Sequence, residues 1–342
     1  MAETGTATRI LILRRDNIGD LVCTTPLLRA LRTQLPGSFL VALVNRYTEP
    51  VLYGNPDLDA VHSYQKAKHR GTDESLAGIY LRRLKTMTEL RRQRFDWLLL
   101  PGGMQAGTAS AVRMIAARRV LVRSTEDAVA GAHEVEQGCH LLIRMGLKYE
   151  APAQQVIPDA AIRRQFAARV ETLLGITPAR VIGVHVSARK ASQRWAAERF
   201  VELIRRIPAV PGTAFMLLWA PGSAGNPRHP GDDKKAARIR ASLAGTPLAP
   251  MATYRLEELI AALSLCDCVI CADGGAMHLA AALGKPVVCL FGDSDATRWR
   301  PWQTVFELLQ APSRNVADIM VEEVLEAYQR LLRAQPHVPM TR

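Results

Sequence analysis

Three cysteines and a histidine lie close together in the stretch CDCVICADGGAMH, residues 266–278. Cys266, Cys268, Cys271 and His278 are all residue types that bind zinc, but their spacing matches no common zinc motif. Alternate side chains of a strand point to opposite faces, so Cys268 and Cys271 should not converge, and Cys266 should end the preceding helix. We therefore expect cysteines buried in a core and no metal.

The glycines that follow the cysteines indicate a different chemistry. Two glycines form a turn after an apolar strand, and the segment AMHLAAAL then begins a helix. Free backbone N–H groups and the positive end of the helix dipole favour an anion such as a diphosphate. His278 is either a buried histidine with satisfied hydrogen bonds or a phosphate contact. The residues expected at the phosphates are Asp273, Gly274, Gly275, Ala276, Met277 and His278.

An aspartate with possible catalytic chemistry follows the first apolar run, RILIL (9–13). The segment RRDNIGD (14–20) is interpreted as a connection between this strand and a helix capped by Thr25, with Gly19 permitting a tight backbone. Asp20 is then either a local turn or cap residue, or an ionised carboxylate near a helix N-terminus that accepts a proton. The sequence alone leaves both interpretations open.

A basic loop, SARKASQRW (187–195), follows the apolar run VIGVHV (181–186). It is either a solvated surface loop or a clamp that holds phosphate oxygens through charge-assisted hydrogen bonds. A phosphate-binding turn elsewhere in the same half of the chain favours the clamp. The residues that would form it are Ser187, Arg189, Lys190, Ser192 and Arg194.

Uninterrupted apolar runs alternate with helical patterns through the whole chain. Strands are expected at 9–13, 38–44, 96–101, 119–122, 181–186, 214–220, 268–272 and 286–291. Such strands are typical of parallel sheets covered by helices on both faces, where ligands bind beyond the carboxyl ends of the strands. We predict an α/β fold of two doubly wound domains, 1–160 and 161–342, facing each other across a cleft. The last helix, around 319–333, could pack against either domain.

The chain is basic, with a formal net charge of +12. Residues 66–94 contain nine basic and three acidic side chains and are expected to form a helix with a basic face. This face is either simply solvated or attracts an anionic partner, such as a phosphorylated glycolipid or a membrane surface. No zinc finger, RNA-binding aromatic motif or basic zipper is present in the sequence, so we expect no nucleic-acid partner.

The location of the protein is predicted from apolar runs and cysteines. No run reaches the roughly 18 residues that a membrane-spanning helix needs, and MAETGTATR lacks the apolar core of a signal peptide. The six cysteines are then expected as reduced thiols. We predict a cytoplasmic protein, with peripheral contact on the inner face of the cytoplasmic membrane as an option.

Three segments together resemble glycosyltransferase family 9, the heptosyltransferases of bacterial lipopolysaccharide assembly. They are LRRDNIGDLVCTTPLLRALR (13–32), HVSARKASQRWAAERFVELI (185–204) and DGGAMHLAAALGKPVVCLFGDSD (273–295). Weaker matches occur at 44–61 and 133–147, so the resemblance covers most of residues 9–303. It implies two Rossmann-like domains in the GT-B arrangement, a nucleotide-diphosphate sugar in the C-terminal domain, an acceptor in the N-terminal domain, and inversion without a metal.

The resemblance also implies roles for individual residues. Asp20 is the general base, and the phosphate-binding turn corresponds to 273–278. Two positions depart from the family: Gln193 stands where a Lys is common, and Gly274 where Thr or Ser is frequent. The basic residues of 187–194 must then neutralise the diphosphate, or the donor differs. Arg14, Asn17 and Gly19 are expected to contact the acceptor.

We expect an enzyme without cofactors that transfers heptose from ADP-heptose to a hydroxyl of an anionic glycolipid of the lipopolysaccharide core. Three alternatives stay open: another donor sugar or acceptor, a sugar-nucleotide epimerase of the same architecture, and a non-catalytic nucleotide-binding subunit. The presence of Asp20 disfavours the last of these. A dinucleotide oxidoreductase is disfavoured because RRDNIGD is not a G-x-G-x-x-G loop.

Overall fold

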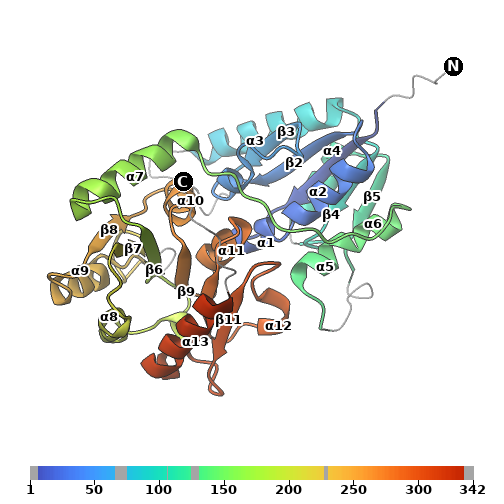
Figure 1. Ribbon diagram of the computed structural model, residues 1–342. Coiled ribbons are helices and arrows are strands. Elements are labelled where there is room, and N and C mark those ends of the chain that lie inside the picture. The colour runs from blue at the N-terminus through green and yellow to red at the C-terminus, as the bar shows by residue number, and fades with distance from the viewer. Residues whose placement is uncertain (1–6, 66–74, 106, 125–130, 227–229, 335–342) are drawn as a thin grey trace. The chain divides into compact units, whose positions relative to one another are not determined.

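The computed structural model describes residues 7–65, 75–105, 107–124, 131–226 and 230–334. The chain divides into two compact units, Met1–Gln155 and Val156–Arg342, close to the boundary expected after residue 160. Each unit is built on one parallel sheet, as labelled in Figure 1.

The first unit contains five strands in the order β3-β2-β1-β4-β5. They are β1 (Arg9–Arg14), β2 (Phe39–Asn45), β3 (Ala60–Tyr64), β4 (Trp97–Leu100) and β5 (Arg119–Val122). Every pair is parallel, and the register aligns Arg14 with Val44 at the carboxyl ends of β1 and β2. Strand β1 lies at the centre of this order, as in a doubly wound fold, in which the strand order reverses beside the first strand.

Helices cover both faces of the first sheet (Figure 1). They are α1 (Ile18–Val22), α2 (Thr25–Gln34), the 3₁₀ turn η1 (Glu49–Leu52), α3 (Leu76–Arg92), α4 (Thr108–Ile115), α5 (Glu134–Cys139) and α6 (Leu141–Arg144). Met87 and Leu90 of α3 and Ile115 of α4 pack against Leu11 and Val41 of the sheet. Helices α2 and α5 contact each other on the other side.

The second unit contains six strands in the order β11-β10-β9-β6-β7-β8. They are β6 (Arg180–His185), β7 (Thr213–Trp219), β8 (Leu248–Ala252), β9 (Cys268–Ala272), β10 (Val287–Phe291) and β11 (Phe306–Gln310). This sheet is also entirely parallel and has its first strand at the centre. Loops after β6 and β9, which are neighbours, therefore emerge side by side at one edge of the sheet.

Helices again cover both faces of this second sheet. They are α7 (Ala160–Leu174), η3 (Ala191–Gln193), α8 (Ala197–Arg206), α9 (Asp233–Ser242), α10 (Leu256–Ser264), α11 (Gly275–Ala282), α12 (Ala296–Trp299), η4 (Val316–Asp318) and α13 (Val321–Ala334). Helix α13, whose partner the sequence leaves open, packs on α8, β10 and β11 and so belongs to this unit. Among the described residues no helix is both long and apolar enough to cross a membrane.

The sequence analysis did not predict three of the strands, β3, β8 and β11. All three are edge strands, paired on one side only. Edge strands are less uniformly apolar than central ones because one flank faces solvent. Strand β8 even contains Pro250, whose missing N–H is tolerated at an edge.

Candidate functional site

Asp20 lies in a short helix directly after the first strand. The expected connection over 14–20 is wrong in part, because residues from Ile18 onward form α1, with Asn17 as its N-cap. Gly19 has an ordinary helical backbone and is buried, so it does not supply the tight turn expected of it. The next helix begins at Thr25 with Thr24 as its N-cap, one residue earlier than predicted.

The carboxylate of Asp20 is held by three hydrogen bonds. Arg14 Nη2 donates to Asp20 Oδ1 at 2.8 Å, and the backbone N–H and Nδ2 of Asn17 donate to Oδ2 at 3.0 and 3.1 Å. The side chain of Asp20 is 16% exposed. Asp20 is thus a cap residue, as one interpretation has it, and its carboxylate is also fixed in one orientation at the carboxyl end of β1.

Arg14 connects Asp20 to two further carboxylates. Its Nη2 also donates to Glu134 Oε1 at 2.8 Å, its Nε lies 2.9 Å from Asp16 Oδ2, and its side chain is 3% exposed. Arg123 Nη1 donates to the same Glu134 oxygen at 2.8 Å. Burial disfavours a charged guanidinium, but the carboxylates of Asp20, Glu134 and Asp16 outweigh it and raise the pKa of Arg14 above its ordinary value. Arg14 therefore stays charged.

Glu134 and Arg123 are not among the residues predicted from the sequence. Glu134 is 1% exposed and begins α5, far along the chain from Arg14. A buried carboxylate is stable only with a cation beside it, and Glu134 has two. The weak family match at 133–147 was the one available signal, and it does not reveal which basic residue is the partner.

In the second unit, the turn between β9 and α11 has the glycine backbone that a close ligand needs. Gly274 has φ +152° and ψ −164°, a region that glycine alone adopts readily, and a Cβ there would meet open space. The N–H of His278 donates to Gly274 O at 3.3 Å, so it is not one of the free N–H groups of the turn. The helical pattern instead leaves the N–H groups of Gly275, Ala276 and Met277 without an acceptor inside α11.

His278 itself is buried. Its side chain is 3% exposed and packs edge-to-face on Trp299, with ring centroids 6.0 Å apart. Met277 is fully buried as well. Both side chains therefore pack inside the unit, and only backbone groups of this turn are open to a ligand.

Asp273 faces Gln193, which comes from the loop after β6. Gln193 Nε2 donates to Asp273 Oδ2 at 2.8 Å and lies 3.4 Å from Ser294 Oγ. Burial raises the pKa of Asp273, while hydrogen bonds from Ser294 and Gln193 oppose the rise. Gln193, 7% exposed, thus supports the turn from inside and is largely shielded from solvent.

The basic loop 187–194 lies beside this turn. Lys190 Nζ pairs with Asp293 Oδ1 at 3.0 Å, and Arg194 Nε donates to Ala188 O at 3.1 Å. Ser187 Oγ accepts from the N–H of Ala220 at 2.9 Å and so ties the loop to the end of β7. The Arg189 side chain is exposed. Three basic side chains, those of Arg189, Lys190 and Arg194, therefore lie on the loop beside the 273–278 turn.

The cysteines of 266–271 are buried and free. Cys268 belongs to the core cluster with Ile270, and Cys271 is aligned with Cys289 of β10. Burial raises the pKa of the Cys266 and Cys271 thiols, so they stay protonated. In the part of the chain that the structure describes, no group of three His, Cys, Asp or Glu side chains could hold a metal ion.

These two sets of residues can be compared with known proteins. The family model for glycosyltransferase family 9 (heptosyltransferase) matches residues 88–328. The chain belongs to this family. It is 24% identical over 348 residues to lipopolysaccharide heptosyltransferase 3 of Escherichia coli strain K12, covering 92% of this chain and 95% of that protein.

Solved structures of family 9 glycosyltransferases share the fold. The chain superposes with a TM-score of 0.78 on a family 9 glycosyltransferase from Veillonella parvula DSM 2008, at 20% identity and covering 96% and 98% of the two chains. An Escherichia coli heptosyltransferase with ADP-2-deoxy-2-fluoro heptose gives a TM-score of 0.71, at 17% identity and 94% and 99% coverage. The expected α/β fold of two Rossmann-like units, as in GT-B glycosyltransferases, is confirmed.

Proposed function

We propose that this glycosyltransferase moves heptose from ADP-heptose to a hydroxyl group of a lipopolysaccharide core acceptor, with inversion and without a metal. The donor is inferred from the family and from the relative whose structure contains an ADP-heptose analogue. The acceptor is inferred from the relative named a lipopolysaccharide heptosyltransferase. The first unit binds the acceptor and the second unit binds the donor.

The observation that carries this proposal is the fixed carboxylate of Asp20. Asn17 donates twice to Oδ2 and Arg14 donates once to Oδ1, which leaves one acceptor site, on Oδ1, of a carboxylate that is still 16% exposed. A group held this way can accept a proton without first reorienting. We take Arg14 and Asn17 as positioning residues, because their hydrogen bonds fix the Asp20 carboxylate. Gly19 contributes as a buried residue of α1.

The reaction is a single displacement. The acceptor hydroxyl oxygen forms the new bond to the anomeric carbon, the bond from that carbon to the diphosphate oxygen breaks on the opposite face, and the hydroxyl proton passes to Asp20. The leaving diphosphate gains negative charge. Helix N–H groups and nearby cations stabilise such charge where it develops.

The second unit supplies groups suited to that leaving diphosphate. The N–H groups of Gly275, Ala276 and Met277 stand at the start of α11, and Arg189, Lys190 and Arg194 stand on the adjacent loop. Asp273, Gly274 and the buried His278 shape the turn, and Ser187 anchors the loop. The cations take the place of the Lys that is common at position 193 in the family.

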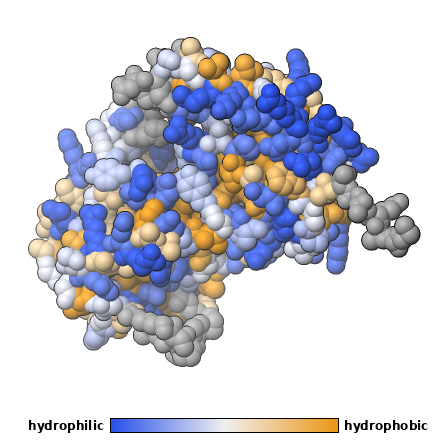
Figure 2. All heavy atoms as spheres, turned by 90° about the horizontal axis from the view of Figure 1, so that it is seen from above, coloured by the Kyte–Doolittle hydropathy of each residue, from blue (hydrophilic) through white to orange (hydrophobic). Residues whose placement is uncertain are grey.

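Helix α3 suits peripheral contact with an anionic membrane surface. Tyr80, Leu81 and Leu84 are 57%, 71% and 52% exposed, and Arg82, Arg83, Arg91 and Arg92 flank them. Figure 2 looks onto the face that carries α3, where hydrophobic and hydrophilic side chains adjoin. Residues 66–74, the rest of the predicted basic stretch, lie outside the described residues. Loss of vesicle binding in L81E/L84E, with donor affinity unchanged, tests this contact.

Calorimetric titration tests the donor assignment. The protein is titrated in EDTA with ADP-heptose, UDP-glucose, UDP-N-acetylglucosamine and GDP-mannose, and we expect selective binding of ADP-heptose. Preference for another nucleotide sugar would overturn the assignment of ADP-heptose as donor. The roles proposed for Asp20 and the 273–278 turn could still be tested with that other sugar. Conversion of a nucleotide sugar without any acceptor would instead identify an epimerase.

A further inference from the structure

The loops after β1 and β4 meet where the strand order of the first sheet reverses. Strand β1 lies between β2 and β4 and pairs with both. In a doubly wound sheet, ligands bind in the crevice beyond the carboxyl ends of the strands at this point. Asp16 follows β1 by two residues, and Gln105 follows β4 by five. Asp16 therefore lies at the same edge of the sheet as Asp20, where a ligand is expected.

Asp16 joins these two loops. Its Oδ1 accepts a hydrogen bond from Gln105 Nε2, and its Oδ2 lies 2.9 Å from Arg14 Nε. Asn45, 2% exposed at the end of β2, donates from Nδ2 to the carbonyl oxygens of Asp16 and of the residue before it. A Cβ on Gly102 would lie 2.5 Å from Asp16 Oδ2, so a larger residue there would displace the carboxylate. Asp16 is thus held in place before a ligand binds.

Arg14 holds Asp16 and Asp20 at a fixed separation. Asp16 contacts Arg14 Nε at 2.9 Å, and Asp20 contacts Nη2 at 2.8 Å. Both nitrogens belong to one planar, rigid group. The Arg14 side chain is 3% exposed, whereas the side chains of Asp16 and Asp20 are 13% and 16% exposed. A ligand in the crevice therefore meets the two carboxylates, while the cation between them stays covered.

Asp16 has more free acceptor capacity than Asp20. A carboxylate offers about four acceptor sites. Three hydrogen bonds occupy Asp20, and the one site left is needed for the proton that it takes. Among the described residues Asp16 meets two donors, Gln105 Nε2 and Arg14 Nε, so about two of its sites remain. Asp16 can therefore accept a hydrogen bond from one hydroxyl while Asp20 deprotonates another.

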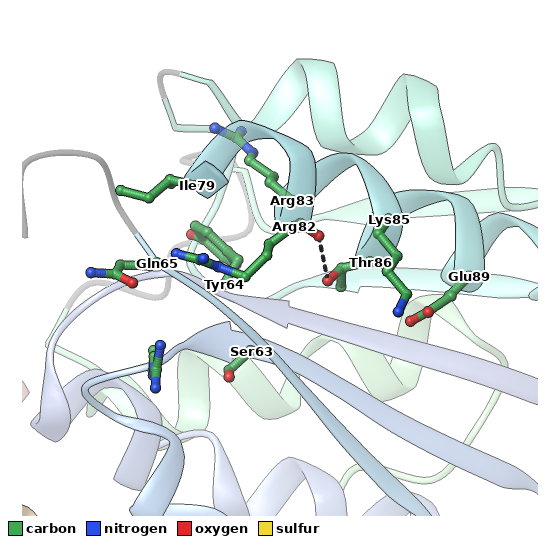
Figure 3. A pocket seen from close by; sticks show the side chains of 10 residues that line it. Ser63, Tyr64, Gln65, Ile79, Arg82, Arg83, Lys85, Thr86 and Glu89 are labelled. Atoms are coloured by element: carbon green, nitrogen blue, oxygen red, sulfur yellow. Dashed lines mark hydrogen bonds between the residues drawn. The ribbon is translucent and has the colours of Figure 1, made fainter. Parts of the chain in front are cut away.

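The chemistry of this crevice differs from that of the pocket beside α3. The charged side chains that line that pocket of about 350 Å³ are Arg46, Arg82, Arg83, Lys85 and Glu89 (Figure 3). In the crevice, the exposed partners of the two carboxylates are neutral amides, those of Asn17 and Gln105. Carboxylates repel anions and accept strong hydrogen bonds from neutral hydroxyls. The crevice therefore suits the hydroxyl groups of an uncharged sugar ring.

We propose that Asp16 binds a second hydroxyl of the acceptor sugar, next to the hydroxyl that Asp20 deprotonates, so that the enzyme selects acceptors in which both are free. This inference rests on the proposed function, since it takes Asp20 as the general base and the first unit as the acceptor-binding one. A hydrogen bond from a hydroxyl to a carboxylate is short and strong. It fixes the orientation of the sugar ring and so aligns the attacking oxygen with the anomeric carbon of the donor.

The test uses the lipid-free core oligosaccharide and monodeoxy analogues that lack one hydroxyl beside the attacked position, which linkage analysis of the product identifies. In the wild type we expect kcat/KM to fall by about 10- to 100-fold on one analogue, the size of a lost hydrogen bond to a charged group. Asp16→Ala should lower kcat/KM on the complete acceptor by at least that factor and show no further loss on that analogue. Asp16→Asn keeps an oxygen that accepts a hydrogen bond, so its ratio between the two acceptors should be intermediate.

Glu134→Gln is the matched control, because Glu134 also contacts Arg14 but is 1% exposed and cannot reach a ligand. It should lower kcat on the complete acceptor and on the analogue alike, and so keep the wild-type ratio between them. A wild-type ratio in Asp16→Ala would reduce Asp16 to a support of Arg14 and overturn the inference.

Two further outcomes are separate. If Asp16→Ala does not fold, the ratio in Asp16→Asn decides alone, and a wild-type ratio there overturns the inference. Equal wild-type kcat/KM on the complete acceptor and on every analogue also overturns it, while the proposed transfer of heptose stands. Absence of any transfer by the wild type to the complete oligosaccharide would instead overturn the proposed function on which the inference rests.

Discussion

Gln193 Nε2 donates a 2.8 Å hydrogen bond to Asp273 Oδ2, which joins the loop after β6 to the turn after β9. Both side chains are buried, at 7% exposure. A lysine at position 193 would place a charge against Asp273, whereas the neutral amide satisfies the carboxylate oxygen without one. Gln193, where the family commonly has Lys, therefore changes the side chain that supports the turn from inside. The basic side chains available for the proposed diphosphate are then Arg189, Lys190 and Arg194.

Removing this hydrogen bond tests that support. In Gln193→Leu the buried Asp273 oxygen loses its donor, and an unsatisfied buried polar group costs about 1–3 kcal/mol. Gln193→Glu should cost more, because two carboxylates would face each other. Urea unfolding should give the order wild type, Leu, Glu in decreasing stability, and ADP affinity should fall in the same order. Wild-type stability in both variants would show that the contact is not formed.

Replacing Asp20 by Asn tests the general base. The amide keeps the shape of the side chain but cannot take the hydroxyl proton, so kcat should fall by about 10²–10⁴-fold. Affinity for the nucleotide sugar should stay unchanged, because the groups proposed to bind the donor lie in the second unit. Steady-state kinetics and calorimetry measure the two effects separately. An active Asn variant would remove Asp20 from the catalytic role.

The central strands and the two motifs that follow them were predictable from sequence. Central parallel strands are buried on both faces, so their apolar runs stand out, as in LLL of β4 and VVCLF of β10. Edge strands such as FELLQ of β11 carry polar residues because solvent reaches one flank. Their sequences then look like loops or helices.

The partners of Asp20 were only partly predictable. Arg14 and Asn17 lie in the same motif, but the sequence analysis expected them to contact the acceptor and did not identify them as hydrogen-bond partners of Asp20. Glu134 meets Arg14 only because α5 folds back against the end of β1, a pairing with no local pattern. The role of Gln193 depends likewise on which side chain faces Asp273 across two loops. Such contacts between distant segments follow from the tertiary fold and have no signature in either segment.

Glu134→Gln should destabilise the first unit. It removes the charge that pairs with both Arg14 and Arg123, and breaking a buried ion pair costs about 3 kcal/mol. We also expect lower kcat, since Arg14 then has one fewer anchor while it orients Asp20. Glu136→Gln is the matched control: two residues further on the same helix, it accepts a hydrogen bond from the N–H of His133 and should cost less than about 1 kcal/mol. Similar losses in the two variants would contradict a special role for Glu134.

Lys235 makes stability depend on pH in a defined window. Burial and the charge of Arg194 lower the pKa of Lys235 from 10.5 to about 8, although Asp232 and Glu198 oppose the shift. The Nζ of Lys235 donates to Val186 O at 2.8 Å. Between these pH values the unfolded chain keeps the proton while the folded protein has lost it. Stability attributable to Lys235 therefore rises as pH rises from about 8 to 10.5, and the penalty is fully present below pH 8.

Lys235→Met removes this titration. Relative to the variant, the wild type should gain about 3 kcal/mol in unfolding free energy across the window, since one pKa unit corresponds to about 1.4 kcal/mol. Subtracting the two profiles cancels the tyrosines and cysteines that titrate in the same range. Lys234→Met, at the exposed neighbouring position, should show no such difference. Parallel wild-type and Lys235→Met profiles between pH 8 and 10.5 would mean that Lys235 is as well hydrated in the folded protein as in the unfolded chain.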